Sequence, residues 1–460
     1  MISIDNRITT EKIRGMMYGL DTPIQHGTGR MAPAVNLDNA ATTPPFNSVA
    51  AEVQKQLLYY GSIGRGAGQK SRHSSEVYTE GRDTVLDFVG AKSDKYTVFY
   101  AASTTDGINK LASALTDPKR SGDVLVITTR MEHHANDLPW RERAYTVHAE
   151  VDNTTGRLIL SDIERLLCQY HSKNMVMYVA VTAASNVTGY VNDVHAIARI
   201  AHKYGAKIIV DGAQIVAHRE FSMLGRKGED EDIDFFVFSA HKMYSPYGGG
   251  AVVGLKDILN EHMPQYYGGG MVITVNDDNV SYADAPDLYE AGSPNVPGVV
   301  GMLKAMETLK SIGFDYVEQH EQRLLRRVLD GLSEINSVTL YGDSMYIKDR
   351  VGIVVFNIKG WEPENVASEL ALRAGISVRH GAFCAHPYVR RLEKSDNLEF
   401  DSPCKPPVGM VRASFGIYTT EKDVDLLINT VKEIAETPPG FANFYDAAQR
   451  KVIQRPNDRG

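Results

Sequence analysis

The sequence is poor in cysteine, has no long apolar run and carries no excess of basic charge. Three cysteines among 460 residues cannot form a disulfide framework, and their odd number is typical of a reducing compartment, which predicts the cytoplasm. No apolar stretch approaches the roughly 20 residues that a membrane helix needs, and the polar N-terminus lacks the apolar core of a secretion signal. The net charge of −8 argues against nucleic-acid binding by phosphate neutralisation. We therefore expect neither a membrane nor a nucleic acid as a partner.

What the chain does contain is an alternation of apolar strands with amphipathic helices. The predicted strand segments share β-branched, apolar residues that run into a polar or glycine-containing turn; they lie at 96–105, 123–134, 176–186, 207–214 and 234–242. Helical periodicity separates them, as at Ile108, Leu111 and Leu115. This alternation predicts an α/β fold with a mostly parallel sheet that helices cover on both faces.

The pattern changes after residue 290. A long helical region is predicted at 298–335, followed by a second α/β unit with strands in VGIVVFNI, ISVRH and MVRASFGIY. A final helix is predicted to begin at Thr420, with Asp423 in a capping arrangement. We predict an N-terminal extension at 1–35, a large domain at 36–297, a smaller C-terminal domain at 298–436 on which the N-terminal segment packs, and a tail at 437–460.

Two polar residues end predicted strands and point to one function. Asp211 ends the strand KIIV, and Lys242 directly follows FFVFSAH. A lysine after a buried strand is costly unless it is paired, or neutral and reactive. Both residues are explained if Lys242 forms a Schiff base with pyridoxal 5′-phosphate (PLP) and Asp211 keeps the pyridine nitrogen protonated. The alternative is a structural ion pair between Lys242 and Asp211 or another acid.

A candidate phosphate site supports the cofactor hypothesis. Thr104 and Thr105 follow Ser103 where a predicted strand gives way to a helix, so that free N–H groups, hydroxyls and the helix dipole favour an anion. Ser239 and His241 flank the lysine and are further candidates for phosphate contacts. The alternative is an ordinary threonine N-cap.

Histidines form two further candidate groups. His133 and His134 follow the strand DVLVITTR, and one imidazole could stack on a cofactor ring and shuttle protons. The pair could instead bind a metal, although no HExxH spacing accompanies it. In the C-terminal domain, His380, Cys384 and His386 form an H-x3-C-x-H group that could bind zinc.

Nine motifs occur in order across most of the chain, from about Asn36 to Glu436. They are LDNAATTPP, TTDGINKLA, MEHHANDLPW, SNVTG, VDGAQ, FSAHKMYSPYGGG, YEAGSPN, RHGAFCAHP and VRASFG. Together they resemble the cysteine desulfurase and selenocysteine lyase group of the class V aminotransferase fold. The resemblance implies a fold-type I, PLP-dependent transferase with a mostly parallel sheet of the seven-stranded type and a smaller C-terminal α/β domain.

The resemblance also implies a role for each matching residue. Lys242 would be the Schiff-base lysine, Asp211 the partner of the pyridine nitrogen, and His133 the histidine stacked on the ring. The other cofactor contacts would be Gln214 and Asn186 near the ring hydroxyl, Thr104, Thr105, Ser239 and His241 at the phosphate, and Ser293, which would reach the phosphate of the partner subunit in a homodimer. Asn39, Asn186 and Arg412 would bind the substrate, Cys384 would be the sulfur-accepting nucleophile, and no metal is expected.

We therefore predict a cysteine desulfurase that converts L-cysteine to L-alanine. Neutral Lys242 would remove the Cα proton, and the Cys384 thiolate would take the sulfur as a persulfide for an acceptor protein. Positive charge on Arg379, His380 or His386 would favour that thiolate. The nearer alternative is another class V reaction on a different amino acid, by an aminotransferase, lyase, selenocysteine lyase or epimerase. The more distant alternatives are a Schiff-base aldolase that uses Lys242 and a zinc-binding regulator.

The sequence departs from the family pattern around the cysteine. Relatives with this activity usually carry two histidines immediately before it, whereas this chain has Ala382 and Phe383. The segment from 386 to 410, which contains Cys404 in a proline-rich stretch, is also longer than expected. Cys168 lies in a predicted helix and is interpreted as a packing residue.

Overall fold

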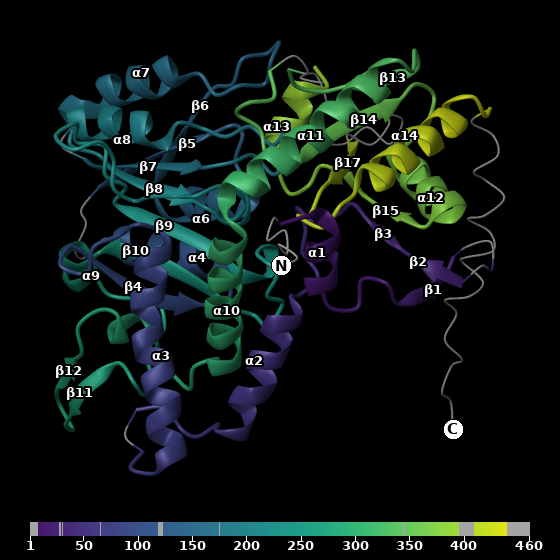
Figure 1. Ribbon diagram of the computed structural model, residues 1–460. Helices are drawn as coiled ribbons and strands as arrows, with labels where there is room; N and C mark the ends of the chain where they lie inside the picture. Colours follow the sequence, from purple (N-terminus) through teal and green to yellow (C-terminus); the bar gives the residue numbers. More distant parts are fainter. Residues whose placement is uncertain are drawn as a thin grey trace, which may run out of the picture.

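The structure, a computed structural model, describes residues 8–26, 29, 31–64, 66–117, 123–173, 175–343, 346–394 and 409–438. Two sheets organise the chain, one of seven strands and one of four (Figure 1). Cys404 and the predicted tail from residue 439 onward lie outside the described residues.

The seven-stranded sheet forms the larger half. From edge to edge it consists of β4 (Tyr96–Ala101), β10 (Gly250–Leu255), β9 (Phe235–Ser239), β8 (Lys207–Asp211), β7 (Val176–Thr182), β5 (Val124–Thr129) and β6 (Tyr145–Ala149). All pairings from β9 to β6 are parallel, whereas β10 runs antiparallel to both β4 and β9. The predicted α/β fold with a mostly parallel sheet is confirmed.

Helices cover both faces of this sheet, which explains why its strands are apolar along their whole length. One face packs against α4 (Thr104–Leu115), α6 (Leu138–Arg143) and α9 (Lys256–Glu261). The other packs against α3 (Gln69–Phe88), α7 (Leu160–Tyr170), α8 (Val194–Lys203) and α10 (Val296–Ile312), with α2 (Asn47–Leu58) against α10. Successive residues of one strand enter opposite cores, as Leu125 and Val126 of β5 do.

The smaller half is built on an antiparallel sheet. Its strands, in order, are β13 (Val338–Leu340), β14 (Ile353–Ile358), β17 (Met410–Ser414) and β16 (Arg379–Gly381). The helices of this half are α11 (Phe314–Ser333), α12 (Pro363–Ala374), α13 (His386–Leu392) and α14 (Glu421–Ala435). The N-terminal segment joins this half, because β3 (Val35–Asn36) pairs with β15 (Ile376–Ser377) and Leu37 enters the core of the smaller half.

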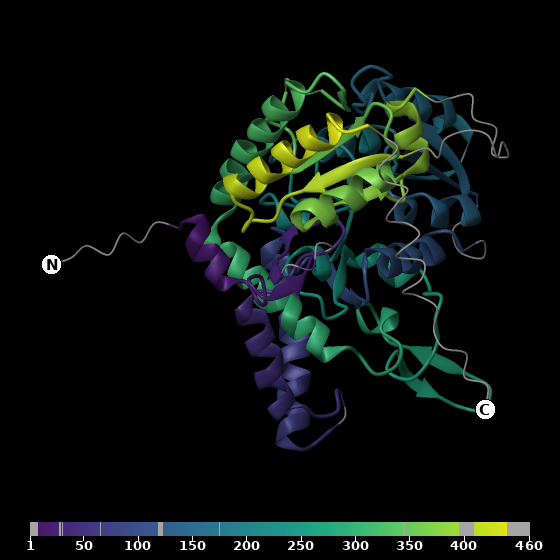
Figure 2. The ribbon, with the colours of Figure 1, turned by 90° about the vertical axis from the view of Figure 1, so that its right-hand side faces the viewer.

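The remaining elements are short. They are α1 (Thr10–Met16), β1 (Pro23–Gln25), β2 (Met31–Pro33), β11 (Val272–Val275), β12 (Val280–Tyr282) and the 3-10 helices η1 (His134–Asn136), η2 (His171–Lys173), η3 (Ile215–Ala217), η4 (Ala240–Lys242) and η5 (Asp287–Tyr289). Figure 2 shows the β11–β12 hairpin projecting from the body of the molecule. Among the described residues, no helix is both long and apolar enough to cross a membrane.

Several predicted elements need correction, and one is confirmed. The helical region at 298–335 is two helices separated by Gly313, whose φ of 88° is easy only for glycine. Residues along α10 pack in the core of the large half, so the packing changes near Gly313 rather than at the predicted boundary at residue 297. The prediction that Cys168 is a packing residue is wrong, because the residue is exposed. The predicted capping of α14 by Thr420 and Asp423 is confirmed as a reciprocal capping box.

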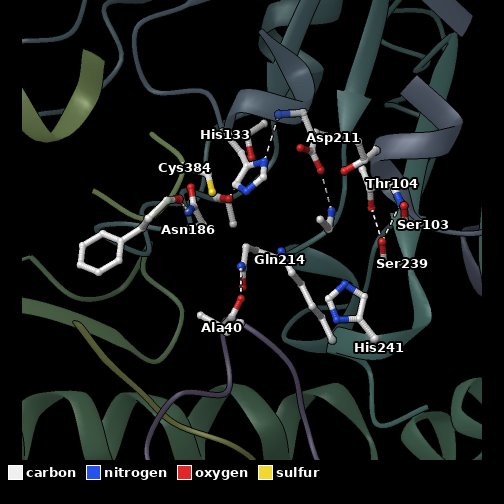
Figure 3. A pocket seen from close by; sticks show the side chains of 18 of the residues that line it. Ala40, Ser103, Thr104, His133, Asn186, Asp211, Gln214, Ser239, His241 and Cys384 are labelled. Atoms are coloured by element: carbon white, nitrogen blue, oxygen red, sulfur yellow. Dashed lines mark hydrogen bonds between the residues drawn. The ribbon is translucent and has the colours of Figure 1, made fainter. Parts of the chain in front are cut away.

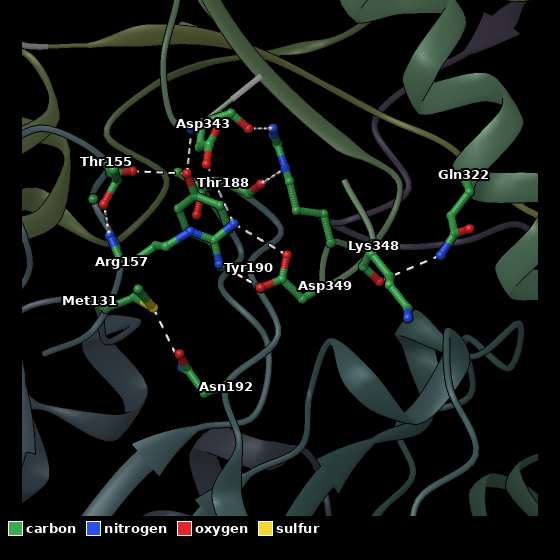
Figure 4. A network of polar contacts seen from close by, with 12 residues as sticks. Met131, Thr155, Arg157, Thr188, Tyr190, Asn192, Gln322, Asp343, Lys348 and Asp349 are labelled. Atoms are coloured by element: carbon green, nitrogen blue, oxygen red, sulfur yellow. Dashed lines mark hydrogen bonds and ion pairs between the residues drawn. The ribbon is translucent and has the colours of Figure 1, made fainter. Parts of the chain in front are cut away.

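A polar network joins the two halves (Figure 4). Arg157 of the large half donates to both carboxylate oxygens of Asp349, at 2.5 and 3.2 Å, and its guanidinium lies 4.4 Å from the centre of the Tyr190 ring. The fully buried Arg350 donates to the carbonyl oxygens of Thr188, Asp343 and Ile353. A buried guanidinium must keep its hydrogen bonds, so this network fixes the small sheet against the large one.

Candidate active site

A cavity of about 220 Å³ opens where the carboxyl ends of the parallel strands meet the smaller half (Figure 3). Ligands of open α/β sheets bind at this edge. The predicted site residues that line it are Thr104, Thr105, His133, Asn186, Asp211, Gln214, Ser239, His241, Lys242, Cys384 and Arg412. The structure therefore brings together residues that the sequence spreads over about two thirds of the chain.

Lys242 and Asp211 face the same cavity and influence each other's charge. Burial lowers the pKa of Lys242 to about 8; the Arg412 guanidinium adds to the decrease, and Asp211 opposes it. At pH 7 roughly a tenth of the lysine is therefore the neutral amine, far more than for an ordinary lysine, and this is the form that acts as a nucleophile or base. Burial raises the pKa of Asp211, while the positive charge of Lys242 acts in the other direction. One oxygen of Asp211 accepts a 2.9 Å hydrogen bond from the backbone N–H of Ala213.

His133 presents a neutral ring to the cavity. Its Nδ1 accepts a 3.1 Å hydrogen bond from the N–H of Ala135, which assigns the ring proton to Nε2. Burial, with the charges of Lys242 and its neighbours, lowers the pKa of His133 to about 3. Figure 3 shows the ring close to Asp211, where a flat neutral imidazole can stack on another aromatic ring.

The opposite end of the cavity is formed by the start of α4. The Thr104 N–H donates to Ser239 Oγ at 2.6 Å, and the two hydroxyl oxygens lie 2.7 Å apart. Ser103 caps the helix by accepting from the N–H of Asp106. Burial and the neighbouring Lys242 lower the pKa of His241 to about 4, so this ring is a neutral hydrogen-bonding group. Hydroxyls at a helix N-terminus favour an anionic ligand.

Gln214 and Arg412 each carry a buried polar atom with no partner among the described residues. Gln214 Nε2 donates to the Ala40 carbonyl at 2.9 Å, whereas its Oε1 accepts nothing. Arg412 donates to the Asn186 carbonyl at 2.8 Å and to Asp38 at 3.0 Å, whereas its Nε has no acceptor. Unsatisfied buried groups are costly, and both side chains line the cavity, which indicates a ligand with complementary polar groups.

Cys384 lies on a turn between β16 and α13 and is exposed. Phe383 and Cys384 have φ angles of 52° and 55°, a left-handed conformation that costs L-residues about 1–2 kcal/mol each. Two hydrogen bonds hold the turn to the large half: Asn186 Nδ2 donates to the Phe383 carbonyl at 2.8 Å, and the His134 N–H donates to the Cys384 carbonyl at 2.6 Å. In Figure 3 the thiol lies next to Asn186 at the side of the cavity away from Ser239.

Two predicted site residues do not line the cavity. The side chain of Asn39 is buried; it donates to the carbonyls of Asn36 and Ser414 and accepts from Tyr418, which uses its amide group within the protein. Ser293 is exposed, in the segment before α10. Within one chain, the structure assigns neither residue to the cavity.

Two charged residues outside the predicted cofactor and substrate contacts also shape the site. Arg379 lines the cavity and lies 3.7 Å from Asp38, which in turn pairs with Arg412. Asp38 was not singled out from the sequence. Its negative charge in the LDNAATTPP motif, next to the predicted ligand-binding residue Asn39, could have indicated it. Across the described residues, no group of three or more His, Cys, Asp or Glu side chains is placed to hold a metal ion. The zinc alternative for His380 and its neighbours thus has no geometric support.

Comparison with known proteins agrees with this geometry. Residues 35–427 match the family described as aminotransferase class-V. The chain belongs to this family. A cysteine desulfurase from Haloferax volcanii is 34% identical over 441 residues, covering 95% of this chain and 96% of the relative. A cysteine desulfurase from Escherichia coli O127:H6 is 32% identical over 422 residues, covering 90% and 96%.

Solved structures show the same class-V architecture. The apo structure of a cysteine desulfurase from Thermococcus onnurineus NA1 matches with a TM-score of 0.77 at 29% identity, covering 88% of this chain and 95% of the other. The cysteine desulfurase CsdA from Escherichia coli, in an S-sulfonic acid form, matches with a TM-score of 0.76 at 27% identity, covering 94% and 99%. The family and the fold-type I architecture predicted from the motifs are confirmed.

Proposed function

We propose that this class-V protein is a PLP-dependent cysteine desulfurase, which converts L-cysteine to L-alanine and keeps the sulfur as a persulfide on Cys384. The observation that carries the proposal is the presence of an exposed thiol, Cys384, in the same cavity as Lys242, Asp211 and Arg412. Removal of a sulfur atom by transfer requires such a thiol, whereas transamination does not. The names of the similar relatives support the same activity.

The residues of the cavity fit PLP. Asp211 is suited to hold the pyridine nitrogen, His133 to stack on the ring, and the unpartnered Oε1 of Gln214 to accept from the ring hydroxyl. The phosphate would bind at the other end, at Thr104, Thr105, Ser239 and His241. When bound, PLP supplies a ring that withdraws electrons from the Cα of the amino acid it carries.

The substrate would bind between Arg412 and Cys384. The free Nε of Arg412 can donate to the α-carboxylate, and the Arg379 guanidinium at the rim adds positive charge. Phe383 replaces a histidine that relatives usually carry, and its ring lies 4.9 Å from the Arg412 guanidinium carbon, so it packs against the proposed carboxylate-binding group.

The reaction then needs two steps from the protein. The neutral amine of Lys242 removes the Cα proton, for which its pKa of about 8 is suitable. The Cys384 thiolate attacks the substrate sulfur, so that a sulfur–sulfur bond forms while the bond from Cβ to sulfur breaks, and protonation of the remaining three-carbon unit gives alanine. The persulfide is left for an acceptor, which we propose is a protein. Because Cys384 must stay a free thiol, the reducing cytoplasm remains our proposed location.

Product analysis with L-cysteine tests the proposed function. We expect the PLP-loaded protein to release alanine and, with a reductant present, an equal amount of sulfide. Pyruvate, ammonia and sulfide in place of alanine would indicate a lyase, and a sulfur-containing keto acid would indicate transamination. Either result would replace the desulfurase proposal.

We further propose a homodimer, in which Ser293 reaches the phosphate of the partner's PLP. Ser293 is exposed and absent from the cavity of its own chain, which supports a contact with a second copy. Ser293→Ala should weaken PLP binding about ten-fold, because a hydrogen bond to a charged group contributes about 1.5–3 kcal/mol. Fluorescence titration of the apoprotein measures this change, with the exposed Ser172→Ala as control. Sedimentation that found an active, PLP-loaded monomer would contradict the proposal.

A further inference from the structure

Two histidines from different halves of the molecule meet beside Cys384. His134 belongs to η1 of the large half, and His386 is the first residue of α13, two positions after the thiol. His134 Nε2 lies 2.9 Å from His386 Nδ1, and the two rings are nearly parallel, at 8°, with their centres 4.8 Å apart. The backbone N–H of His386 also donates to His134 Nε2, at 3.4 Å.

These contacts define the protonation state of the pair. His134 Nε2 accepts from the backbone N–H, so it must carry a lone pair rather than a proton. Nδ1 of His386 must then be the donor in the ring-to-ring bond. If His134 Nε2 were protonated, its N–H would point at the backbone N–H and the Nδ1–H of His386, and no hydrogen bond could form. The contact therefore exists only while His134 is neutral.

The turn that carries Cys384 depends on contacts from outside it. Two consecutive non-glycine residues in the left-handed region persist only where the surroundings hold them. The backbone N–H of His134 holds the Cys384 carbonyl at 2.6 Å, and its ring holds His386 on the other side of the thiol. His134 thus contacts the chain at two points, the backbone carbonyl of Cys384 and the ring of His386 at the start of α13.

We propose that His134 and His386 are positioning residues for the Cys384 thiol, and that they hold its turn against the large half only while His134 is neutral. The use of this thiol in sulfur transfer rests on the proposed function, whereas the holding of the turn does not. His386, two positions after Cys384, would thereby help to position the thiol. This chain lacks the two histidines that relatives usually carry immediately before the cysteine.

The charges around the pair set the direction of its pH dependence. The titratable and charged groups that face it are His133, Asp137 and Arg141 from the large half and Cys384 and Arg390 from the small half. Burial, the partner ring and Arg141 lower the pKa of His134, against an increase from Asp137. Burial and Arg390 lower the pKa of His386. With both pKa values below 6.5, the contact is intact at neutral pH and is lost as the pH falls through the lowered values.

Hydrogen exchange of the PLP-loaded protein, without any amino acid, tests the proposal. At about pH 7.5 we expect His386→Ala to speed exchange in the peptide around Cys384 at least about ten-fold. His386→Asn should restore protection, because its amide places a donor near the position of Nδ1. His380→Ala, an exposed histidine on β16, serves as the matched control and should exchange like the wild type.

The pH readout separates a positioning role from simple packing. After correction for intrinsic exchange, the wild-type peptide should lose protection as the pH falls below the ordinary histidine range, whereas His134→Gln should keep it, because an amide oxygen accepts the same bonds and does not titrate. Wild-type exchange in His386→Ala, or an unchanged acid loss of protection in His134→Gln, would overturn the proposal. If the exchange results hold and no alanine is formed from cysteine, the proposed function fails while the positioning role stands.

Discussion

Lys242→Ala is expected to reduce alanine formation by about 10²–10⁴-fold or more. The substitution removes the amine proposed both to bind PLP covalently and to take the Cα proton, and no other lysine lines the cavity among the described residues. The measurements are alanine release from L-cysteine and the visible absorption of the purified protein. Both should collapse, while the circular dichroism of the folded chain is retained.

A surface lysine provides the matched control. Lys95 pairs with Asp232 at 2.8 Å; the lysine is exposed to solvent and the aspartate is partly exposed. Exposed ion pairs contribute about 0–1 kcal/mol, so Lys95→Ala should leave turnover and absorption unchanged. Wild-type turnover in Lys242→Ala would show that the reactive lysine has been misidentified.

The pH profile of the active protein should reflect the same lysine. Burial lowers the pKa of Lys242, so the neutral base becomes available at lower pH than for an ordinary lysine, near a value of about 8. Cα deprotonation should accordingly rise with pH through this region. The Arg412 guanidinium helps to lower the pKa of Lys242, so the pH profile depends on both residues.

The residues at strand ends were predictable because a polar side chain after a buried strand has few explanations. Asp211 and Lys242 were identified by this rule, and the parallel order of β8 and β9 brings them to one cavity. The rule works because strand periodicity and burial are local properties of the sequence.

Contacts between distant segments were not predictable in this way. Asn39 was assigned to the substrate, yet its amide is bound by Ser414 and Tyr418, more than 370 positions away in the chain. The packing of Phe383 on Arg412 and the bond between His134 and His386 likewise depend on how the halves meet. No local pattern indicates which side chains such a meeting brings together.

Cys384→Ala is expected to lower alanine and sulfide formation from L-cysteine by at least about 100-fold, with PLP binding preserved. The substitution removes the only described thiol in the cavity. Alanine is no worse than cysteine in the left-handed conformation, and the bond from the His134 N–H reaches the backbone carbonyl of residue 384. The turn should therefore keep its shape, and the loss would report on the sulfur atom itself.

The second exposed cysteine makes this test specific. Cys168 is also a free, exposed thiol, but it lies on α7 and does not line the cavity, so Cys168→Ala should leave the rate unchanged. After incubation with L-cysteine, mass spectrometry of the wild-type protein should find an extra sulfur atom on the peptide that contains Cys384 and none on the peptide that contains Cys168. Full alanine production by Cys384→Ala would exclude the persulfide mechanism at this residue. An extra sulfur atom on Cys404 would move the nucleophile to the segment after α13, because a thiolate must reach the substrate sulfur directly to accept it.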